Sequence, residues 1–322
     1  MENSINDRIN QLASAQIPFL LIIDFEMNKP ILLTEEEALK QGVFYATKIK
    51  KNFTFNNKAT ESFTFNKTPI PYEKYLESFL KVQQHIDQGN TFLLNLTFPT
   101  AVETDLTLKN IFEISKSPYK LLYKNEFVCF SPEPFISIRN RKIFSNPMKG
   151  TIDAAVEGAR QILIQDEKEI AEHNTIVDLI RNDLSKVALD VKVNRFRYIE
   201  EIKTNDKTLL QLSSEIIGTL PEDYLVRLGE LIFDLVPAGS VSGAPKKKTT
   251  EIIREVEMDE RGYYTGVFFL FDGEDLDSAV MIRFIENKDG GMVYRSGGGI
   301  TTKSDPAKEY QELIDKVYVP IY

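Results

Sequence analysis

The stretch Lys120–Ser145, which reads KLLYKNEFVCFSPEPFISIRNRKIFS, indicates the fold class. It contains short apolar runs separated by turn residues, and such runs are typical of β-strands. The expected strands are Lys120–Tyr123, Glu126–Ser131, Phe135–Arg139 and Lys142–Ser145. Elsewhere in the chain, strand-like and helical segments also come in blocks without regular alternation. This order favours an α+β fold with largely antiparallel sheets packed as a core and helices outside.

Other segments extend this pattern in both directions. The apolar, β-branched run from Ile17 to Leu33 predicts a core strand followed by a second strand. We expect helices at Tyr72–Gln88, near Leu209–Gly218, and between about Gly158 and Val187. Because we find no internal repeat and no Gly/Ser linker, we expect one domain over residues 1–322.

The charge and composition of the chain argue against several classes of partner. The net charge of −9 gives no electrostatic reason to expect nucleic acid or an anionic membrane. The N-terminus lacks a basic segment followed by an apolar one, and no apolar stretch approaches ~18 residues. We therefore expect a cytoplasmic protein with no nucleic-acid or membrane partner.

Cysteine chemistry is also restricted by the sequence. Cys129 is the only cysteine, and His85 and His173 are the only histidines, which excludes an internal disulfide and a zinc cluster. Cys129 lies in an apolar run that is typical of a buried, inert thiol. If the protein uses ammonia released from glutamine by a cysteine, another chain must supply it.

The five residues Pro147-Met148-Lys149-Gly150-Thr151 follow the expected strands. A lysine between a stiffening proline and a glycine can act as a nucleophile, but it can equally be an exposed lysine in a turn. The pentapeptide alone leaves both interpretations open.

Acidic residues in two expected helices are candidate metal ligands. Asp305 or Ser304 caps the last helix, and Glu309, Glu312 and Lys316 recur on one face of it. Two carboxylates three residues apart suit a divalent cation with hard oxygen ligands, although a simple Glu312–Lys316 surface pair is the alternative. Glu172 lies on an earlier helix, where an acidic side chain is usually solvated.

Two glycine-rich stretches could present main-chain amides to an anion. Pro237–Lys246 leads into a helix whose first turn we expect to contain Pro245. Ser296–Ile300 follows an expected strand and could form a carboxylate-binding nest. Each stretch could also be only a tight turn.

Several motifs, taken together and in this order, closely resemble the chorismate-utilising enzymes, a family with anthranilate synthase component I, aminodeoxychorismate synthase component I, isochorismate synthase and salicylate synthase. The resemblance covers the chain from about Tyr72 onward and implies the fold of anthranilate synthase component I. The N-terminal part, about residues 1–70, is short relative to most relatives, which puts the family's tryptophan site near Ile22–Phe25 in doubt. The motifs are Pro147–Thr151, Glu172–Leu184, Pro237–Lys246, Arg261–Gly266, Ile282-Arg283, Gly297–Ile300 and Asp305–Glu312.

The resemblance implies a set of site residues. Lys149 would attack C2 of chorismate and expel the C4 hydroxyl, and ammonia would then attack C4 and expel the lysine. A neutral amine is needed for this, so we expect burial or a neighbouring cation to lower the pKa of Lys149. Magnesium would be bound by Glu172, Glu309 and Glu312. Substrate contacts would come from Gly150, Thr151, Ser240, Tyr264, Arg283, Gly298, Gly299 and Lys316.

Differences from relatives narrow the expected reaction. A lysine at position 149 is similar to aminodeoxychorismate synthases, whereas the other members usually have alanine there. Gln211 stands where anthranilate synthases carry a histidine linked to pyruvate elimination, and Leu93 stands where isochorismate and salicylate synthases carry a water-activating lysine.

These residues lead to one expected function and two alternatives. The resemblance implies conversion of chorismate and ammonia to 4-amino-4-deoxychorismate, the precursor of 4-aminobenzoate and folate, with ammonia from a separate glutamine amidotransferase. The alternatives are an anthranilate synthase component I and a non-catalytic chorismate-binding partner.

Overall fold

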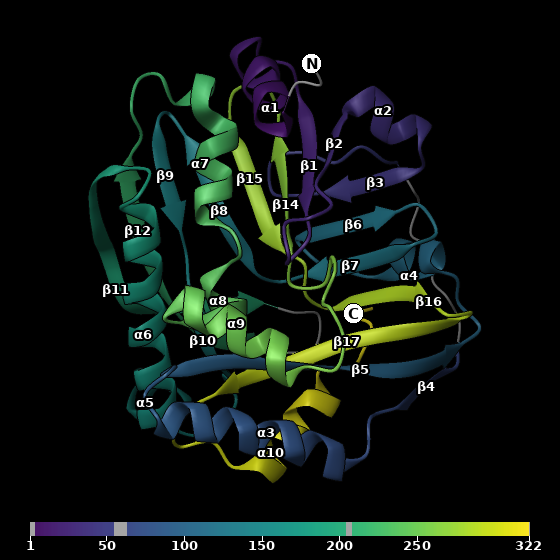
Figure 1. The fold of residues 1–322 in the computed structure, drawn as a ribbon, viewed down its shortest axis with the longest axis vertical. Helices are drawn as coiled ribbons and strands as arrows, with labels where there is room; N and C mark the ends of the chain where they lie inside the picture. The colour runs from purple at the N-terminus through teal and green to yellow at the C-terminus, as the bar shows by residue number, and fades with distance from the viewer. Residues whose placement is uncertain (1–3, 55–62, 204–207, 322) are drawn as a thin grey trace.

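The computed structural model describes residues 4–54, 63–203 and 208–321, and within these ranges the strands form two sheets (Figure 1). The nine-stranded sheet has the order β10-β12-β9-β8-β15-β14-β1-β2, and β11 also pairs with β12. Its strands are β1 (Phe19–Ile23), β2 (Ile31–Thr34), β8 (Pro134–Arg139), β9 (Lys142–Ser145), β10 (Met148–Asp153), β11 (Leu189–Lys203), β12 (Thr208–Thr219), β14 (Val267–Phe271) and β15 (Leu276–Val280).

The eight-stranded sheet has the order β13-β5-β17-β16-β7-β6-β3, and β4 pairs with β5. In the described ranges, neighbouring strands pair antiparallel in both sheets, which confirms the expected α+β class. The strands of the eight-stranded sheet are β3 (Val43–Ala46), β4 (Phe65–Thr68), β5 (Leu93–Thr104), β6 (Tyr119–Tyr123), β7 (Phe127–Ser131), β13 (Gly243–Ala244), β16 (Phe284–Lys288) and β17 (Gly291–Ile300).

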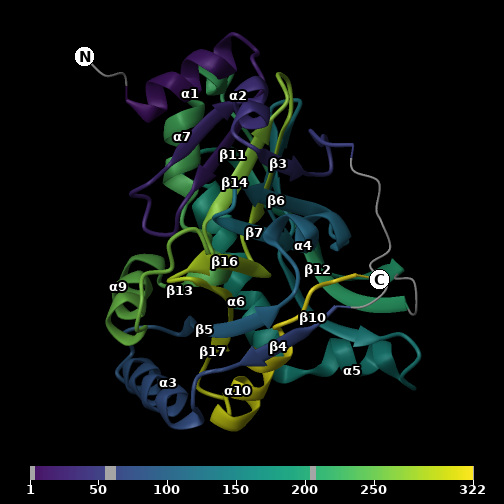
Figure 2. The ribbon, with the colours of Figure 1, turned by 90° about the vertical axis from the view of Figure 1, so that its right-hand side faces the viewer.

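Helices cover the outer faces of the sheets, as expected. Figures 1 and 2 show α1 and α7 at one end of the molecule and α3 and α10 together at the other end. Apolar residues of α1, α6 and α7 share one core cluster with the nine-stranded sheet, while those of α3, α9 and α10 share another with β5. The helices are α1 (Ile5–Ser14), α2 (Glu35–Lys40), α3 (Tyr72–Asp87), α4 (Leu108–Ile114), α5 (Ala159–Gln165), α6 (Glu167–Leu184), η1 (Tyr224–Arg227), α7 (Leu228–Leu235), α8 (Gly239–Ser242), α9 (Lys246–Val256) and α10 (Pro306–Asp315).

The strands expected in Lys120–Ser145 all exist, with bounds within one residue of those expected. They are divided between the two sheets, however. Strands β6 and β7 belong to the eight-stranded sheet, and β8 and β9 belong to the nine-stranded sheet. The chain therefore crosses between the sheets at Pro132-Glu133, which brings an acidic side chain to the junction.

Three local predictions were wrong. Leu209–Gly218 lies in β12 and not in a helix, because Leu210, Leu212 and Ile216 alternate with more exposed residues and the strand pairs with three neighbours. Pro245 is the N-cap of α9 and does not lie in its first turn. Ser296–Ile300 continues strand β17 and is not a loop.

The glycines of β17 have a packing role in this strand. A Cβ atom at Gly297 would lie 2.4 Å from the carbonyl oxygen of Leu96 in the paired strand β5. Glycine therefore permits a close approach between two strands, which the sequence pattern alone does not distinguish from a turn.

That the chain is a single domain stays a prediction.

Arg261 connects segments that are distant in the sequence. Its side chain is 1% exposed and donates to both carboxylate oxygens of Glu257, at 2.8 and 2.6 Å. It also donates to the carbonyl oxygens of Val241 in α8 and Asn95 in β5, at 2.7 and 2.6 Å. Glu257 in turn accepts from the main-chain N–H of Thr97, at 2.9 Å. One buried ion pair thus holds α8, β5 and the turn after α9 together.

In the part of the chain that the structure describes, no helix is both long enough and apolar enough to cross a membrane.

We predict that Arg261→Met lowers the free energy of unfolding by about 3–5 kcal/mol, because it leaves the Glu257 carboxylate buried without its cation. Urea denaturation followed by circular dichroism measures this change. The double variant Arg261→Met/Glu257→Gln should recover a substantial part of the loss. A loss below about 1 kcal/mol in the single variant would show that the pair does not hold these segments together.

Candidate functional site

One cavity of about 450 Å³ is lined by every site residue expected from the sequence. Its walls come from both sheets and from α6, α8 and α10. The structure therefore brings together segments that lie more than 100 residues apart in the chain, while their roles stay predictions. The expected residues in its lining are Lys149, Gly150, Thr151, Glu172, Ser240, Tyr264, Arg283, Gly298, Gly299, Glu309, Glu312 and Lys316.

Lys149 lies in strand β10, and its Nζ is 3.0 Å from Oε2 of Glu172 on α6. Burial alone would lower the pKa of Lys149, but the Glu172 carboxylate, with Glu169 and Glu133 nearby, raises it above the ordinary lysine value. The expectation of a lowered pKa was therefore wrong for this state of the site. The amine is held as an ammonium ion by a carboxylate from a distant helix.

Lys316 is the second amine in the cavity. It donates to Glu312 and to the carbonyl oxygen of Gly297, both at 2.7 Å. Burial lowers the pKa of Lys316, the Glu312 carboxylate opposes this shift, and the charges of Lys149 and Arg283 add to it. The Glu312–Lys316 pair is thus formed, but it lines the cavity instead of being a remote surface pair.

Carboxylates converge on the glycines of β17. A methyl group at Gly298 would lie 3.5 Å from Oε2 of Glu309 and 3.5 Å from Oε1 of Glu312, and one at Gly299 would lie 3.4 Å from Oε2 of Glu172. Any larger side chain at these two positions would enter the space between the acids. The glycines therefore keep that space open.

The donor chemistry of these acids fits a magnesium ion, since carboxylate oxygens are the hard ligands that Mg²⁺ prefers. Glu309 is buried, at 4% exposure, and Glu172 is 5% exposed. Within the described ranges, however, no group of three or more His, Cys, Asp or Glu side chains is close enough together to hold a metal ion. Lys149 and Lys316 each contact one of the acids in this structure.

Arg283 lies in the cavity in an uncommon backbone conformation. Its φ of 52° falls in the left-handed region, which costs a non-glycine residue about 1–3 kcal/mol. Its guanidinium lies over the ring of Tyr318, with 5.3 Å between Cζ and the ring centroid. A planar guanidinium suits two-point binding of a carboxylate, and the strained backbone directs it into the cavity.

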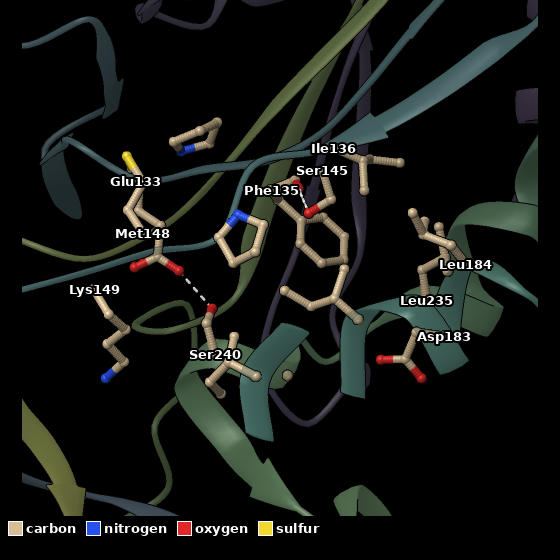
Figure 3. Close-up of a pocket in the computed structure, with 15 residues that line it drawn as sticks. Glu133, Phe135, Ile136, Ser145, Met148, Lys149, Asp183, Leu184, Leu235 and Ser240 are labelled. Atoms are coloured by element: carbon tan, nitrogen blue, oxygen red, sulfur yellow. Dashed lines mark hydrogen bonds between the residues drawn. The ribbon is translucent and has the colours of Figure 1, made fainter. Parts of the chain in front are cut away.

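Two acidic residues in the cavity lining, Glu133 and Glu169, were not predicted from the sequence. The Oγ of Ser240 donates to Glu133 Oε1 at 2.5 Å (Figure 3). Burial raises the pKa of Glu133, while the Ser240 hydroxyl and the charge of Lys149 oppose that shift. A proline on each side of Glu133, at the end of a strand, was the available sequence signal.

Glu169 lies one helical turn before Glu172 on α6, and its Oε2 would be 3.5 Å from a methyl group at Gly150. The spacing of Glu169 and Glu172 repeats that of Glu309 and Glu312 on α10. This repeated spacing is the signal that could have identified it.

Gln211 and Leu93, the two positions at which the sequence departs from the expected motifs, lie in the cavity wall and beside it. Gln211 in β12 lines the cavity and donates from Nε2 to Thr151 Oγ1 at 3.2 Å. Leu93 Cδ1 would lie 3.0 Å from a methyl group at Gly299, beside Glu172. An amide and an alkyl group thus occupy these positions, and neither exchanges protons near neutral pH.

Comparison with known proteins identifies relatives of two named activities. The chain is 48% identical over 313 residues, covering 97% of each chain, to a protein of Pasteurella multocida named "Uncharacterized PabA-like protein". It is 31% identical to aminodeoxychorismate synthase component 1 of Bacillus subtilis and 34% identical to anthranilate synthase component 1 of Archaeoglobus fulgidus. These two matches cover 78% and 76% of this chain but only 55% and 61% of those longer proteins.

Solved structures share the fold. The anthranilate synthase component I of Streptococcus pneumoniae superposes with a TM-score of 0.72 over 98% of this chain and 85% of that chain, at 20% identity. The menaquinone-specific isochorismate synthase of Escherichia coli gives a TM-score of 0.74 over 96% and 79%, at 16% identity. The expected anthranilate synthase component I-like fold is thus confirmed. A family model described as chorismate binding enzyme matches residues 23–321, and the chain belongs to that family.

Proposed function

We propose that this chain is an aminodeoxychorismate synthase component I, which converts chorismate and ammonia to 4-amino-4-deoxychorismate. The observation that carries the proposal is the amine of Lys149 inside the cavity, 3.0 Å from Glu172. Gln211 and Leu93 support it, because neither can take the proton-transfer role of the histidine or lysine of relatives.

The first step forms a bond between the Lys149 amine and C2 of chorismate as the C4 hydroxyl leaves. Glu172, the hydrogen-bonded carboxylate, passes the ammonium proton of Lys149 to solvent beforehand, so it is ionised again when it holds a metal ion. We assign Glu133 as the proton donor for the departing hydroxyl, because it lines the cavity together with Lys149 and burial raises its pKa. The products of this step are a lysine adduct, water and the Glu133 carboxylate.

In the second step ammonia attacks C4 and the C2–N bond to Lys149 breaks, which releases the lysine as a neutral amine. The new C4 ammonium group gives a proton to the Glu133 carboxylate. Glu133 is thereby returned to its acid form, and Lys149 takes back a proton from solvent, which completes the cycle. One carboxyl group serves as the acid in the first step and as the base in the second.

Residues around the cavity hold the substrate. Arg283 and Lys316 are the cations for its carboxylates, and Tyr264 contributes a hydroxyl. Glu172, Glu309 and Glu312 would hold Mg²⁺, which when bound compensates the charge of the substrate carboxylate. The remaining contacts would come from Gly150, Thr151, Ser240, Gly298 and Gly299.

A separate glutamine amidotransferase is the proposed source of ammonia, in the cytoplasm. The single cysteine, Cys129, is fully buried in β7, and burial raises the pKa of its thiol. A thiol in that environment is a poor nucleophile for releasing ammonia from glutamine.

We predict that mixing the protein with chorismate and Mg²⁺, without ammonia, gives an adduct with the mass of chorismate less one water. Intact-protein mass spectrometry detects it. Lys149→Ala should abolish the adduct, whereas Lys142→Ala, which removes an exposed lysine from strand β9 of the same sheet, should not. An adduct that persists in Lys149→Ala moves the nucleophile elsewhere. If ammonium is then added, anthranilate formed without a lyase indicates an anthranilate synthase.

We predict that Ser240→Ala moves the alkaline limb of the pH profile of kcat/KM to higher pH. Removing the hydroxyl takes away a donor to the ionised Glu133, so the pKa of this acid rises further and its protonated form persists to higher pH. Glu133→Gln should abolish the limb. Ser145→Ala is the control, since that hydroxyl bonds the carbonyl of Phe135. A limb unmoved in Ser240→Ala would contradict the role of Glu133.

We predict that Glu309→Gln weakens Mg²⁺ binding by at least about tenfold, because it removes a buried hard ligand. Isothermal calorimetry measures the affinity without reference to turnover. Asp315→Asn, which changes another carboxylate of α10, is the control. Equal Mg²⁺ affinity in Glu309→Gln and the wild type would remove Glu309 from the proposed metal site.

A further inference from the structure

A second cavity of about 90 Å³ lies directly beside the substrate cavity (Figure 3). The two cavities share Glu133, Met148, Lys149 and Ser240 as lining residues. We call this second space the inner chamber. Figure 3 shows the Glu133–Ser240 hydrogen bond on one side of it and apolar side chains on the other.

The size and lining of the inner chamber determine which class of molecule it can hold. About 10–15 Å³ is enough for one water-sized molecule, so the chamber holds a few such molecules but no substituted ring. Aliphatic and aromatic side chains form much of its wall and disfavour an unpaired ion. These side chains are Phe135, Ile136, Ile176, Ile180, Leu184 and Leu235.

Asp183 is an acidic residue in the chamber wall, and its charge is compensated. Lys246 Nζ lies 2.5 Å from its Oδ2, and Lys186 Nζ lies 2.7 Å from its Oδ1. The chamber therefore offers little attraction to ammonium, and a small neutral molecule suits it better.

The inner chamber also shares part of its lining with a cavity of about 500 Å³. These two spaces share Pro134, Phe135, Ile136 and Ser145 as lining residues. The outer space has a polar lining that includes Arg139 and Lys142, which are exposed side chains. The chamber thus adjoins both the cavity that contains the lysine and a second cavity with exposed side chains in its lining.

We propose that the inner chamber is the route by which ammonia reaches C4 of the lysine adduct, arriving past Glu133 and Ser240. This inference rests on the proposed function. Glu133 lies where the chamber meets the substrate cavity, so the residue that protonates the departing hydroxyl also meets the arriving ammonia. After ammonia attacks C4, the C2–N bond breaks and Glu133 takes the proton, as in the second step above.

Two variants at one position test the route. Ile180→Phe fills the chamber and should raise the KM for ammonia at least about tenfold, equivalent to ~1.4 kcal/mol, while the KM for chorismate stays unchanged. Ile180→Ala widens it and should increase the use of methylamine relative to ammonia. Thr175→Phe is the control, because it fills a different pocket on the other side of Glu172.

Adduct formation without ammonia separates this inference from the proposed function. If the wild-type protein forms neither adduct nor product, the proposed function itself is wrong. If the adduct forms in the variants but the KM for ammonia and the methylamine preference do not change, the chamber is not the route. A rise in the KM for ammonia in Thr175→Phe alone would also overturn it. Should Ile180→Phe fail to fold, the methylamine preference of Ile180→Ala decides.

Discussion

The buried contact between Arg261 and Glu257 is the constraint on which the architecture of the cavity depends. It joins the carbonyl groups of α8 and β5 to the turn that carries Tyr264. A guanidinium can satisfy several acceptors at once in a fixed plane, which a lysine at this position could not do. Because α8 carries Ser240 and β5 pairs with β17, this single contact positions two walls of the cavity.

The second constraint is the charge balance inside the cavity. Lys149 and Lys316 each contact one carboxylate, and Glu169, Glu309 and Glu133 also line the space. Acids in such an enclosed space need cations near them, and here the two amines and Arg283 supply the charge. A negatively charged substrate alone would favour the ammonium form of Lys149 still more, whereas a bound metal cation would favour the neutral amine. The raised pKa of Lys149 thus describes the site before substrate binds.

Local patterns predicted much of the fold and of the cavity lining. The strands of Lys120–Ser145 were found within one residue, because alternating apolar runs bounded by turn residues have few alternatives. The Glu309 and Glu312 pair was identified from helical spacing alone. The helix predicted at Leu209–Gly218 was wrong because its clustered leucines and isoleucines suit either a helix or a strand. Only pairing with β10, β11 and β9 decides between them.

Features that arise from distant contacts could not be predicted. Lys149 meets Glu172 only after α6 packs against β10, so the direction of its pKa shift depends on tertiary structure. Glu133 was missed because a single acid between prolines has no spacing partner, and its role follows from the crossing between the two sheets. The proposed mechanism requires a covalent bond between Lys149 and the substrate. A crystal structure of the protein soaked with chorismate and Mg²⁺ in the absence of ammonia tests it most directly. Continuous density between Nζ of Lys149 and C2 of the ring is the predicted result. Intact chorismate with Lys149 still hydrogen-bonded to Glu172 would contradict the account.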